Sequence, residues 1–173
     1  MSKPDLMSEH SADAVLNALA VKVGAHLQRA GVSLATAESC TGGWVAQSIT
    51  AIAGSSAWFD RGFVTYSNEA KQEMLGVAPS TIAAHGAVSE PTAGEMATGA
   101  LAHSRAGIAV AITGVAGPSG GSPAKPVGTV CIAWATRGGS PSAQTFHFAG
   151  DRESVRRQSV ETALEGVLQR LRA

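Results

Sequence analysis

The chain has 173 residues, enough for one domain that buries about 70% of the surface of its unfolded chain. Charged residues make up only 15% and the formal net charge is zero, which excludes the broad basic surface that nucleic acids or anionic membranes require. Because so little of the surface is charged, we also expect another subunit to cover part of it, in a homo-oligomer such as a dimer.

The first half of the chain alternates helical and extended patterns after a polar start. Residues 1–11 are predicted to be flexible, and a single domain is expected over residues 12–173. The elements predicted from apolar periodicity and from breaker residues are a helix over 11–30, a strand over 32–37, a helix over 44–52, a strand over 58–66, a helix over 68–75 and a short helix over 79–86. Asn68 is the expected N-cap of the helix that ends before Gly76.

The second half of the chain ends with a predicted hairpin and a long helix. The expected elements are a helix over 89–104, a buried strand over 107–112, a loop over 114–126, a strand over 129–136, its hairpin partner over 144–148 and a final helix capped by Asp151. Helices that alternate with strands and a closing hairpin predict a three-layer α/β/α fold with a mixed sheet of about five strands.

The turn over residues 38–43 is the clearest candidate site. It has the sequence Glu-Ser-Cys-Thr-Gly-Gly and joins a predicted strand to a predicted helix. The first N–H groups of a helix can bind an oxyanion or a phosphate, and glycine lets a ligand approach the backbone closely. Ser39 or Thr41 would then lie where a developing oxyanion or a phosphate could be held. The alternative is an ordinary helix cap formed by Ser39 or Thr41.

A serine nucleophile in this turn needs a base. His85 is the best placed of five histidines, and the alternative base is a lysine with a lowered pKa. Lys71 lies one turn into a helix that follows a strand, at the edge where α/β sites form, and burial there would favour its neutral form. Tyr66, the only tyrosine, ends the same strand and could orient Lys71 or relay a proton. Alternatively, Lys71 is a solvated helix residue beside Glu69 and Glu73.

Two further segments could bind an anion. Residues 113–121 follow a buried strand and contain four glycines, so they could form a backbone nest or only a flexible connection. Arg152 lies in the first turn of the last helix, an unfavourable place for a cation. An anionic ligand would explain it, and so would an ion pair with Glu153.

The two cysteines, Cys40 and Cys131, cannot form a disulfide framework and match no zinc spacing. We therefore expect no metal and no cofactor. Cys40 is an alternative nucleophile that lacks a convincing histidine partner, and Cys131 is expected in the core. The sequence shows no secretory signal and no apolar run near the ~20 residues that cross a bilayer, which predicts a cytosolic protein without membrane contact.

Six segments form an ordered series of motifs. They are residues 36–43 (TAESCTGG), 54–56 with 62–71 (GSS, GFVTYSNEAK), 86–91 (GAVSEP), 113–118 (TGVAGP), 125–130 (KPVGTV) and 150–152 (GDR). Together they resemble the CinA C-terminal domain family over about residues 12–172. The one departure is Val115, which replaces the isoleucine usual in that family.

The resemblance implies an amidohydrolase that converts nicotinamide mononucleotide (NMN) to nicotinic acid mononucleotide and ammonia in pyridine-nucleotide salvage. It implies Ser39 as nucleophile, Lys71 as base and Tyr66 in an assisting role. The residues then expected to hold the oxyanion or the substrate, its phosphate included, are Thr41, Gly42, Gly43, Thr113, Gly114, Gly117 and Arg152. Two alternatives remain: a non-catalytic nucleotide-binding or regulatory domain that uses the same loops, and a pure interaction protein, which only the low charge supports.

Overall fold

The computed structural model describes residues 6–172, with side chains from residue 12 onward. The first helix, α1 (Leu6–Ala30), begins at Leu6 rather than at the predicted Ser11. The prediction of a flexible start over residues 1–11 therefore falls in part on residues 1–5, which lie outside the described residues. No helix in the described part of the chain is long and apolar enough to cross a membrane.

The remaining elements follow the predicted order along the chain. The strands are β1 (Leu34–Glu38), β2 (Phe59–Val64), β3 (Ile108–Gly114), β4 (Thr129–Thr136) and β5 (Ser142–His147). The helices are α2 (Trp44–Thr50), α3 (Asn68–Leu75), α4 (Pro79–His85), α5 (Glu90–Ala102) and α6 (Arg152–Arg172), with a short 3-10 helix at Ser55–Ala57. Asn68 is not the N-cap of α3: Ser67 is, because its hydroxyl accepts a hydrogen bond from the Ala70 amide.

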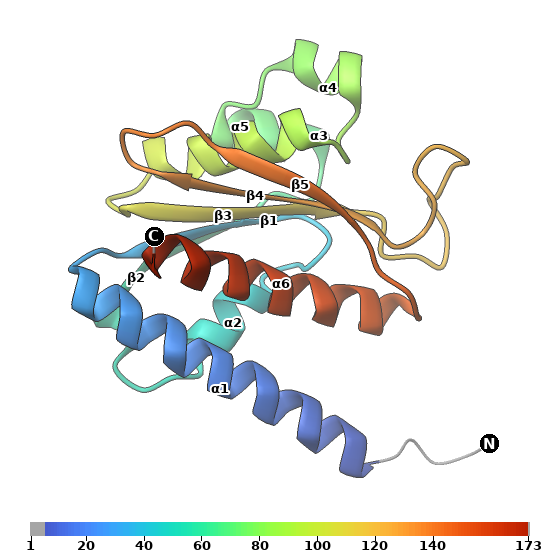
Figure 1. The fold of residues 1–173 in the computed structure, drawn as a ribbon. Coiled ribbons are helices and arrows are strands. Elements are labelled where there is room, and N and C mark those ends of the chain that lie inside the picture. The colour runs from blue at the N-terminus through green and yellow to red at the C-terminus, as the bar shows by residue number, and fades with distance from the viewer. Residues whose placement is uncertain (1–5, 173) are drawn as a thin grey trace.

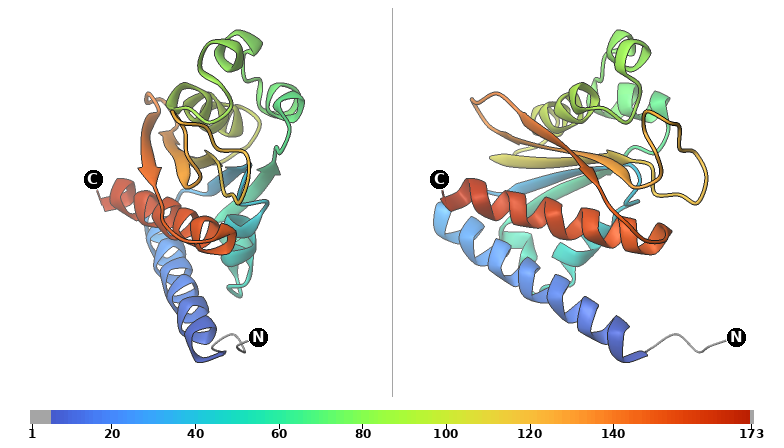
Figure 2. Two further views of the ribbon diagram at one scale, coloured as in Figure 1. Left: turned by 90° about the vertical axis from the view of Figure 1, so that its right-hand side faces the viewer. Right: turned by 45° about the vertical axis from the view of Figure 1, so that its right-hand side comes forward.

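The sheet has five strands in the order β2-β1-β3-β4-β5. Strands β2, β1 and β3 run parallel, and β4 and β5 pair antiparallel at the other edge. Helices α1, α2 and α6 lie on one side of the sheet, and α3, α4 and α5 lie on the other, where α5 packs on the strands and α4 lies outermost, against α5 (Figures 1 and 2). The predicted three-layer α/β/α fold with a mixed five-stranded sheet is thus confirmed.

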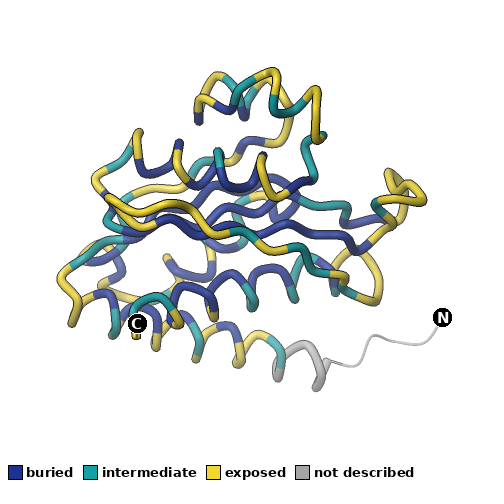
Figure 3. Tube along the Cα trace, turned by 45° about the horizontal axis from the view of Figure 1, so that its top comes forward, coloured by how far each residue is buried: buried dark blue, intermediate teal, exposed yellow. Residues whose placement is uncertain are grey.

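The two faces of the sheet differ in side-chain size because successive residues of a strand point to opposite faces. In β3, Ile108, Val110 and Ile112 pack under α1, α2 and α6, whereas Ala109 and Ala111 face α5. The small residues let α5 lie close to the sheet. Buried residues accordingly follow the strands through the middle of the molecule, and residues 118–127 form a mostly exposed loop (Figure 3).

The parallel strands bring three segments of the chain to one edge of the sheet. Glu38, the last residue of β1, pairs with Val64 at the end of β2 and with Ile112 near the end of β3. Residues that come directly after these strands therefore leave the sheet at its carboxyl edge, where open α/β sheets form their sites. The candidate residues near positions 39, 66–71 and 113 all lie there.

Candidate active site

The nucleophile candidate is fixed directly to the sheet. The Ser39 amide donates to the Ile112 carbonyl over 3.0 Å, so this residue extends the pairing of β1 with β3 by one position. Its side chain is largely buried, with 8% of its surface exposed. A hydroxyl held this way has a defined position before any ligand binds.

Lys71 meets Ser39 inside the protein. Its Nζ lies 3.0 Å from Ser39 Oγ, and the residue is only 1% exposed. The alternative of a solvated surface lysine is therefore wrong. The expected proximity of the two side chains is present, at a distance that allows direct proton transfer.

The surroundings of Lys71 suit a neutral amine. Nζ donates to the carbonyls of Thr65 and Tyr66, at 2.9 and 3.2 Å, and the Ser67 carbonyl is 3.5 Å away. A neutral amine has two N–H groups, which these first two carbonyls can accept, and one lone pair, which is left for the Ser39 hydroxyl proton.

Burial also lowers the pKa of Lys71 below its ordinary value of 10.5, because the charged form loses its hydration. Within the described residues no carboxylate lies close enough to form an ion pair with its ammonium group. Desolvation outweighs the opposing effect of the nearby Cys40 thiol, so the free base forms at a lower pH than in an exposed lysine.

Tyr66 contributes to the site differently from the expectation. Its carbonyl contacts Lys71, but its side chain is 65% exposed and its hydroxyl lies 3.4 Å from a guanidinium nitrogen of Arg152. The other end of the Arg152 guanidinium donates to the Gly117 carbonyl over 2.7 Å. The ion pair with Glu153 that could have explained Arg152 is absent among the described residues, since Glu153 pairs with Arg157.

A cavity of about 200 Å³ joins the predicted residues. Six of its lining residues were predicted for the site: Ser39, Tyr66, Lys71, Thr113, Gly114 and Arg152. The other lining residues are Cys40 and Ala116, from segments already considered, and Asn68, Ala87 and Val88, which were not proposed for the site. Thr113 Oγ1 donates to the Ala87 carbonyl over 2.8 Å, so its lone pairs stay free to accept a hydrogen bond from a ligand.

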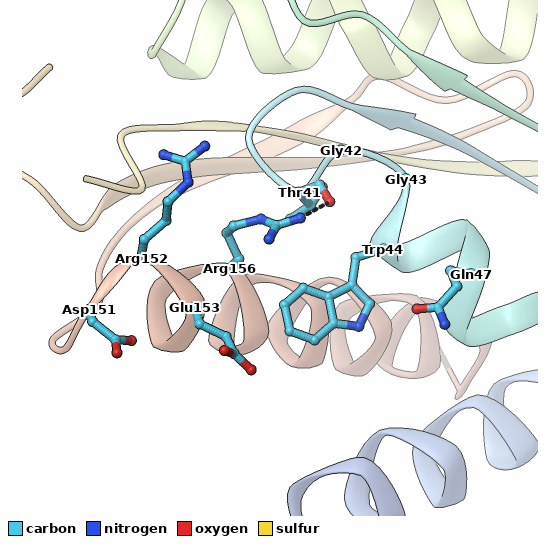
Figure 4. A pocket seen from close by; sticks show the side chains of 9 residues that line it. All are labelled: Thr41, Gly42, Gly43, Trp44, Gln47, Asp151, Arg152, Glu153 and Arg156. Carbon is cyan, nitrogen blue, oxygen red and sulfur yellow. Dashed lines mark hydrogen bonds between the residues drawn. The ribbon is translucent and has the colours of Figure 1, made fainter. Parts of the chain in front are cut away.

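A second, more open cavity of about 680 Å³ adjoins the first at Arg152 (Figure 4). It lies between the start of α2 and the first turns of α6. Its lining residues are Thr41, Gly42, Gly43, Trp44, Gln47, Asp151, Arg152, Glu153 and Arg156. This cavity is therefore lined by three residues that were expected near the nucleophile: Thr41, Gly42 and Gly43. In the described structure, Gly117 contacts the site through its hydrogen bond from Arg152.

The amides of the two glycines are not available to an oxyanion, so that part of the expectation is wrong. Gly42 donates to the Ser39 carbonyl over 3.1 Å, and Gly43 donates to Glu38 Oε2 over 3.0 Å. The glycines instead supply backbone geometry, with φ of 60° and 98°, in the left-handed region that glycine tolerates best. Among the described residues of the turn, the Cys40 and Thr41 amides have no hydrogen-bond partner.

Glu38 organises the turn, a role that the sequence did not suggest. Its buried carboxylate accepts from Thr41 Oγ1 over 2.7 Å and from the amides of Gly43, Val45 and Ala46 over 2.9–3.1 Å. These donors occupy the start of α2, where a negative charge is favourable. The signal available in the sequence was an acidic residue at the start of the turn that leads into a predicted helix.

Arg156 is the second residue that the sequence did not suggest. It lies on α6 four residues after Arg152, so both side chains project from the same face of the helix. Its guanidinium donates to the carbonyls of Cys40 and Thr41, each over 3.1 Å. The spacing to Arg152 was the signal that could have found it.

Cys40 is poorly suited to act as the nucleophile. Burial raises the pKa of its thiol to about 12, so the reactive thiolate is scarce at neutral pH. Cys131 is buried in β4, as predicted. His85 does not line the cavity either: its carbonyl accepts a hydrogen bond from Lys125.

The fold and the site together define a three-layer α/β domain with a buried serine–lysine pair at the carboxyl edge of its parallel strands. The model of the CinA C-terminal domain family matches residues 16–171. The chain belongs to this family.

Named relatives and solved structures agree with this assignment. The chain is 57% identical over 157 residues to the nicotinamide-nucleotide amidohydrolase PncC of Escherichia coli K12, covering 91% of this chain and 95% of that protein. A protein of the same name from Pseudomonas putida is 52% identical over 154 residues, covering 89% and 96%. The crystal structure of the competence/damage inducible protein CihA from Agrobacterium tumefaciens superposes with a TM-score of 0.88 at 48% identity, covering 92% and 96%.

Proposed function

We propose that this chain is an amidohydrolase that releases ammonia from the carboxamide of NMN and leaves nicotinic acid mononucleotide. The observation that carries the proposal is the 3.0 Å contact between Ser39 Oγ and a buried Lys71. It is supported by the names of relatives that are more than half identical to this chain.

The first half of the proposed reaction acylates the serine. Neutral Lys71 accepts the Ser39 hydroxyl proton, and Oγ attacks the carboxamide carbon. The Cys40 and Thr41 amides, which have no other partner in the described turn, stabilise the oxyanion of the tetrahedral intermediate. Lys71 then gives its proton to the departing nitrogen, which leaves as ammonia, and a nicotinoyl ester remains on Ser39.

The second half restores the enzyme. Water attacks the ester carbonyl while Lys71 accepts its proton, and the oxyanion again points to the same two amides. Collapse breaks the bond to Ser39 Oγ, which regains the proton from Lys71. Nicotinic acid mononucleotide leaves as a carboxylate.

The two cavities suggest how the substrate lies. A volume of about 200 Å³ accommodates a pyridine carboxamide but is small for a nucleotide, since pockets for whole ligands measure about 300–1,000 Å³. The ring therefore enters the inner cavity, with Thr113 accepting a hydrogen bond from the amide. The ribose phosphate extends towards Arg152 and residues 113–121, where Tyr66 assists by contacting the same guanidinium.

Replacing Ser39 by Ala tests the proposal. We expect the S39A variant to remain folded, because its backbone bond to Ile112 is unaffected, and to release ammonia from NMN at less than about one-thousandth of the wild-type rate. Cys40→Ser is the matched control, since it changes the adjacent side chain and should keep most of the activity. Wild-type activity in S39A would refute the nucleophile.

The same assay separates the enzyme from a regulatory domain built on the same loops. A wild-type chain that binds NMN between neutral and mildly alkaline pH without releasing ammonia would be a binding domain. Two further expectations remain predictions: a location in the cytosol, and self-association as a dimer, which light scattering of the purified chain would measure.

A further inference from the structure

Arg156 joins the last helix to the nucleophile turn although the proposed reaction gives it no role. Its Nε donates to the Cys40 carbonyl and its Nη2 donates to the Thr41 carbonyl, each over 3.1 Å. Figure 4 shows the side chain reaching from α6 across the wall of the open cavity to Thr41. One planar group thus holds two consecutive peptide units.

The bond to the Cys40 carbonyl determines where an amide points, whereas the Thr41 carbonyl also accepts from the Trp44 amide. In a trans peptide the C=O and the following N–H point in opposite directions. The Ser39 carbonyl accepts from Gly42, which directs the Cys40 N–H away from that bond. Among the described residues, the only donor to the Cys40 carbonyl is Arg156, so Arg156 alone directs the Thr41 N–H.

The guanidinium itself is held in place. Its carbon lies 5.2 Å from the ring centroid of Trp44, a distance suited to a cation–π interaction. Trp44 begins α2, the helix whose start Glu38 caps. A lysine could supply the charge but not two parallel donors in one plane.

We propose that Arg156 is a positioning residue for the oxyanion site, which aims the Thr41 amide at the developing charge by holding the Cys40 carbonyl. The inference rests on the proposed function only through the acylation of Ser39. It predicts an effect on the chemical step, because Arg156 lines the open cavity rather than the inner one and both of its observed donors are already bonded to the turn.

The experiment compares Arg156→Met and Arg156→Lys with a matched control, Arg157→Met. Arg157 stacks on the same Trp44 ring, at 5.0 Å, and pairs with Asp13 and Glu153, but it makes no bond to the turn. Ammonia release from NMN gives kcat and KM for each chain, measured at a temperature at which circular dichroism shows it to be folded.

We expect Arg156→Met to lower kcat by about 100-fold, in the range seen when an oxyanion donor is lost, with KM within about threefold of wild type. Arg156→Lys, which keeps the charge and most of the packing, should lose about tenfold, and Arg157→Met should lose less than threefold. A kcat of Arg156→Met within threefold of wild type, or an equal loss in Arg157→Met, would overturn the inference.

A second measurement separates this inference from the proposed substrate. A fluorophosphonate probe that phosphonylates Ser39 also places an oxygen in the oxyanion site and needs no knowledge of the substrate. The labelling rate should fall in the same order, with Arg156→Met slowest. A wild-type chain that labels Ser39 but releases no ammonia from NMN would refute the proposed substrate alone, whereas equal labelling of all chains would overturn the role of Arg156.

Discussion

Replacing Glu38 by Gln tests the organisation of the turn most directly. Oε2 accepts from Thr41 Oγ1, Gly43 N and Val45 N, and Oε1 accepts from Ala46 N. The glutamine oxygen can replace Oε2, but its NH₂ group would then face the Ala46 amide. Loss of one charge-assisted bond and weakening of three others should lower the free energy of unfolding by about 3 kcal/mol.

Urea unfolding monitored by circular dichroism measures this change, with ammonia release from NMN as the second readout. Glu95→Gln is the matched control, because that carboxylate also accepts an amide and a hydroxyl, from Ala78 and Thr81, but at the start of α4. We expect a loss of about 1 kcal/mol and an unchanged kcat in this control. A loss below about 1 kcal/mol in Glu38→Gln would refute the reasoning, because four donors at a buried carboxylate cannot then be organising α2.

The remaining predictions concern the lysine and the core. The value of kcat/KM should rise with pH along a limb whose pKa lies below 10.5, because only neutral Lys71 can accept a proton, and Lys71→Met should lack both this limb and the activity. Between the lowered pKa of Lys71 and 10.5, the unfolded chain binds more protons than the folded chain. The free energy of unfolding should therefore rise with pH in that window, and urea unfolding of Lys71→Met should show no such rise. Tyr66→Phe should leave the rising limb of kcat/KM at the same pH, since Tyr66 contacts Lys71 through its backbone carbonyl. A displaced limb would show that the Tyr66 hydroxyl affects the pKa of Lys71. Gly166→Ala should lower the free energy of unfolding by about 1–3 kcal/mol, because its Cβ would lie 2.2 Å from the Trp134 ring, and an unchanged urea midpoint would contradict this packing.

The layers and the location of the site were accessible from the sequence because they depend on local patterns. The apolar runs bounded by breaker residues mark the strands, and Gly76 marks the end of α3 without reference to distant residues. Parallel strands bring the segments after them to the same edge of a sheet, which accounts for the common location of Ser39 and Lys71. Their direct pairing was expected only from the family resemblance.

The details of the turn depend on contacts that no local pattern contains. Arg156 is separated from Cys40 by 116 positions, and only the packing of α6 beside α2 brings them together. Gly42 and Gly43 were expected to offer free amides, yet Glu38 and the Ser39 carbonyl accept their hydrogen bonds. Composition indicates that a turn can present N–H groups, but it cannot show which of them already have acceptors.

The charges around Ser39 show why the turn needs both the hydrogen bonds to Glu38 and those from Arg156. The Glu38 carboxylate belongs to the residue next to Ser39, and an unsatisfied negative charge there would oppose an oxyanion and favour protonated Lys71. Its four donors direct that charge into the start of α2, while the Arg156 cation lies on the carbonyl side of the same turn. In the proposed mechanism Lys71 becomes a cation as the oxyanion forms, so the attraction between the two new charges stabilises the transition state more than the ground state.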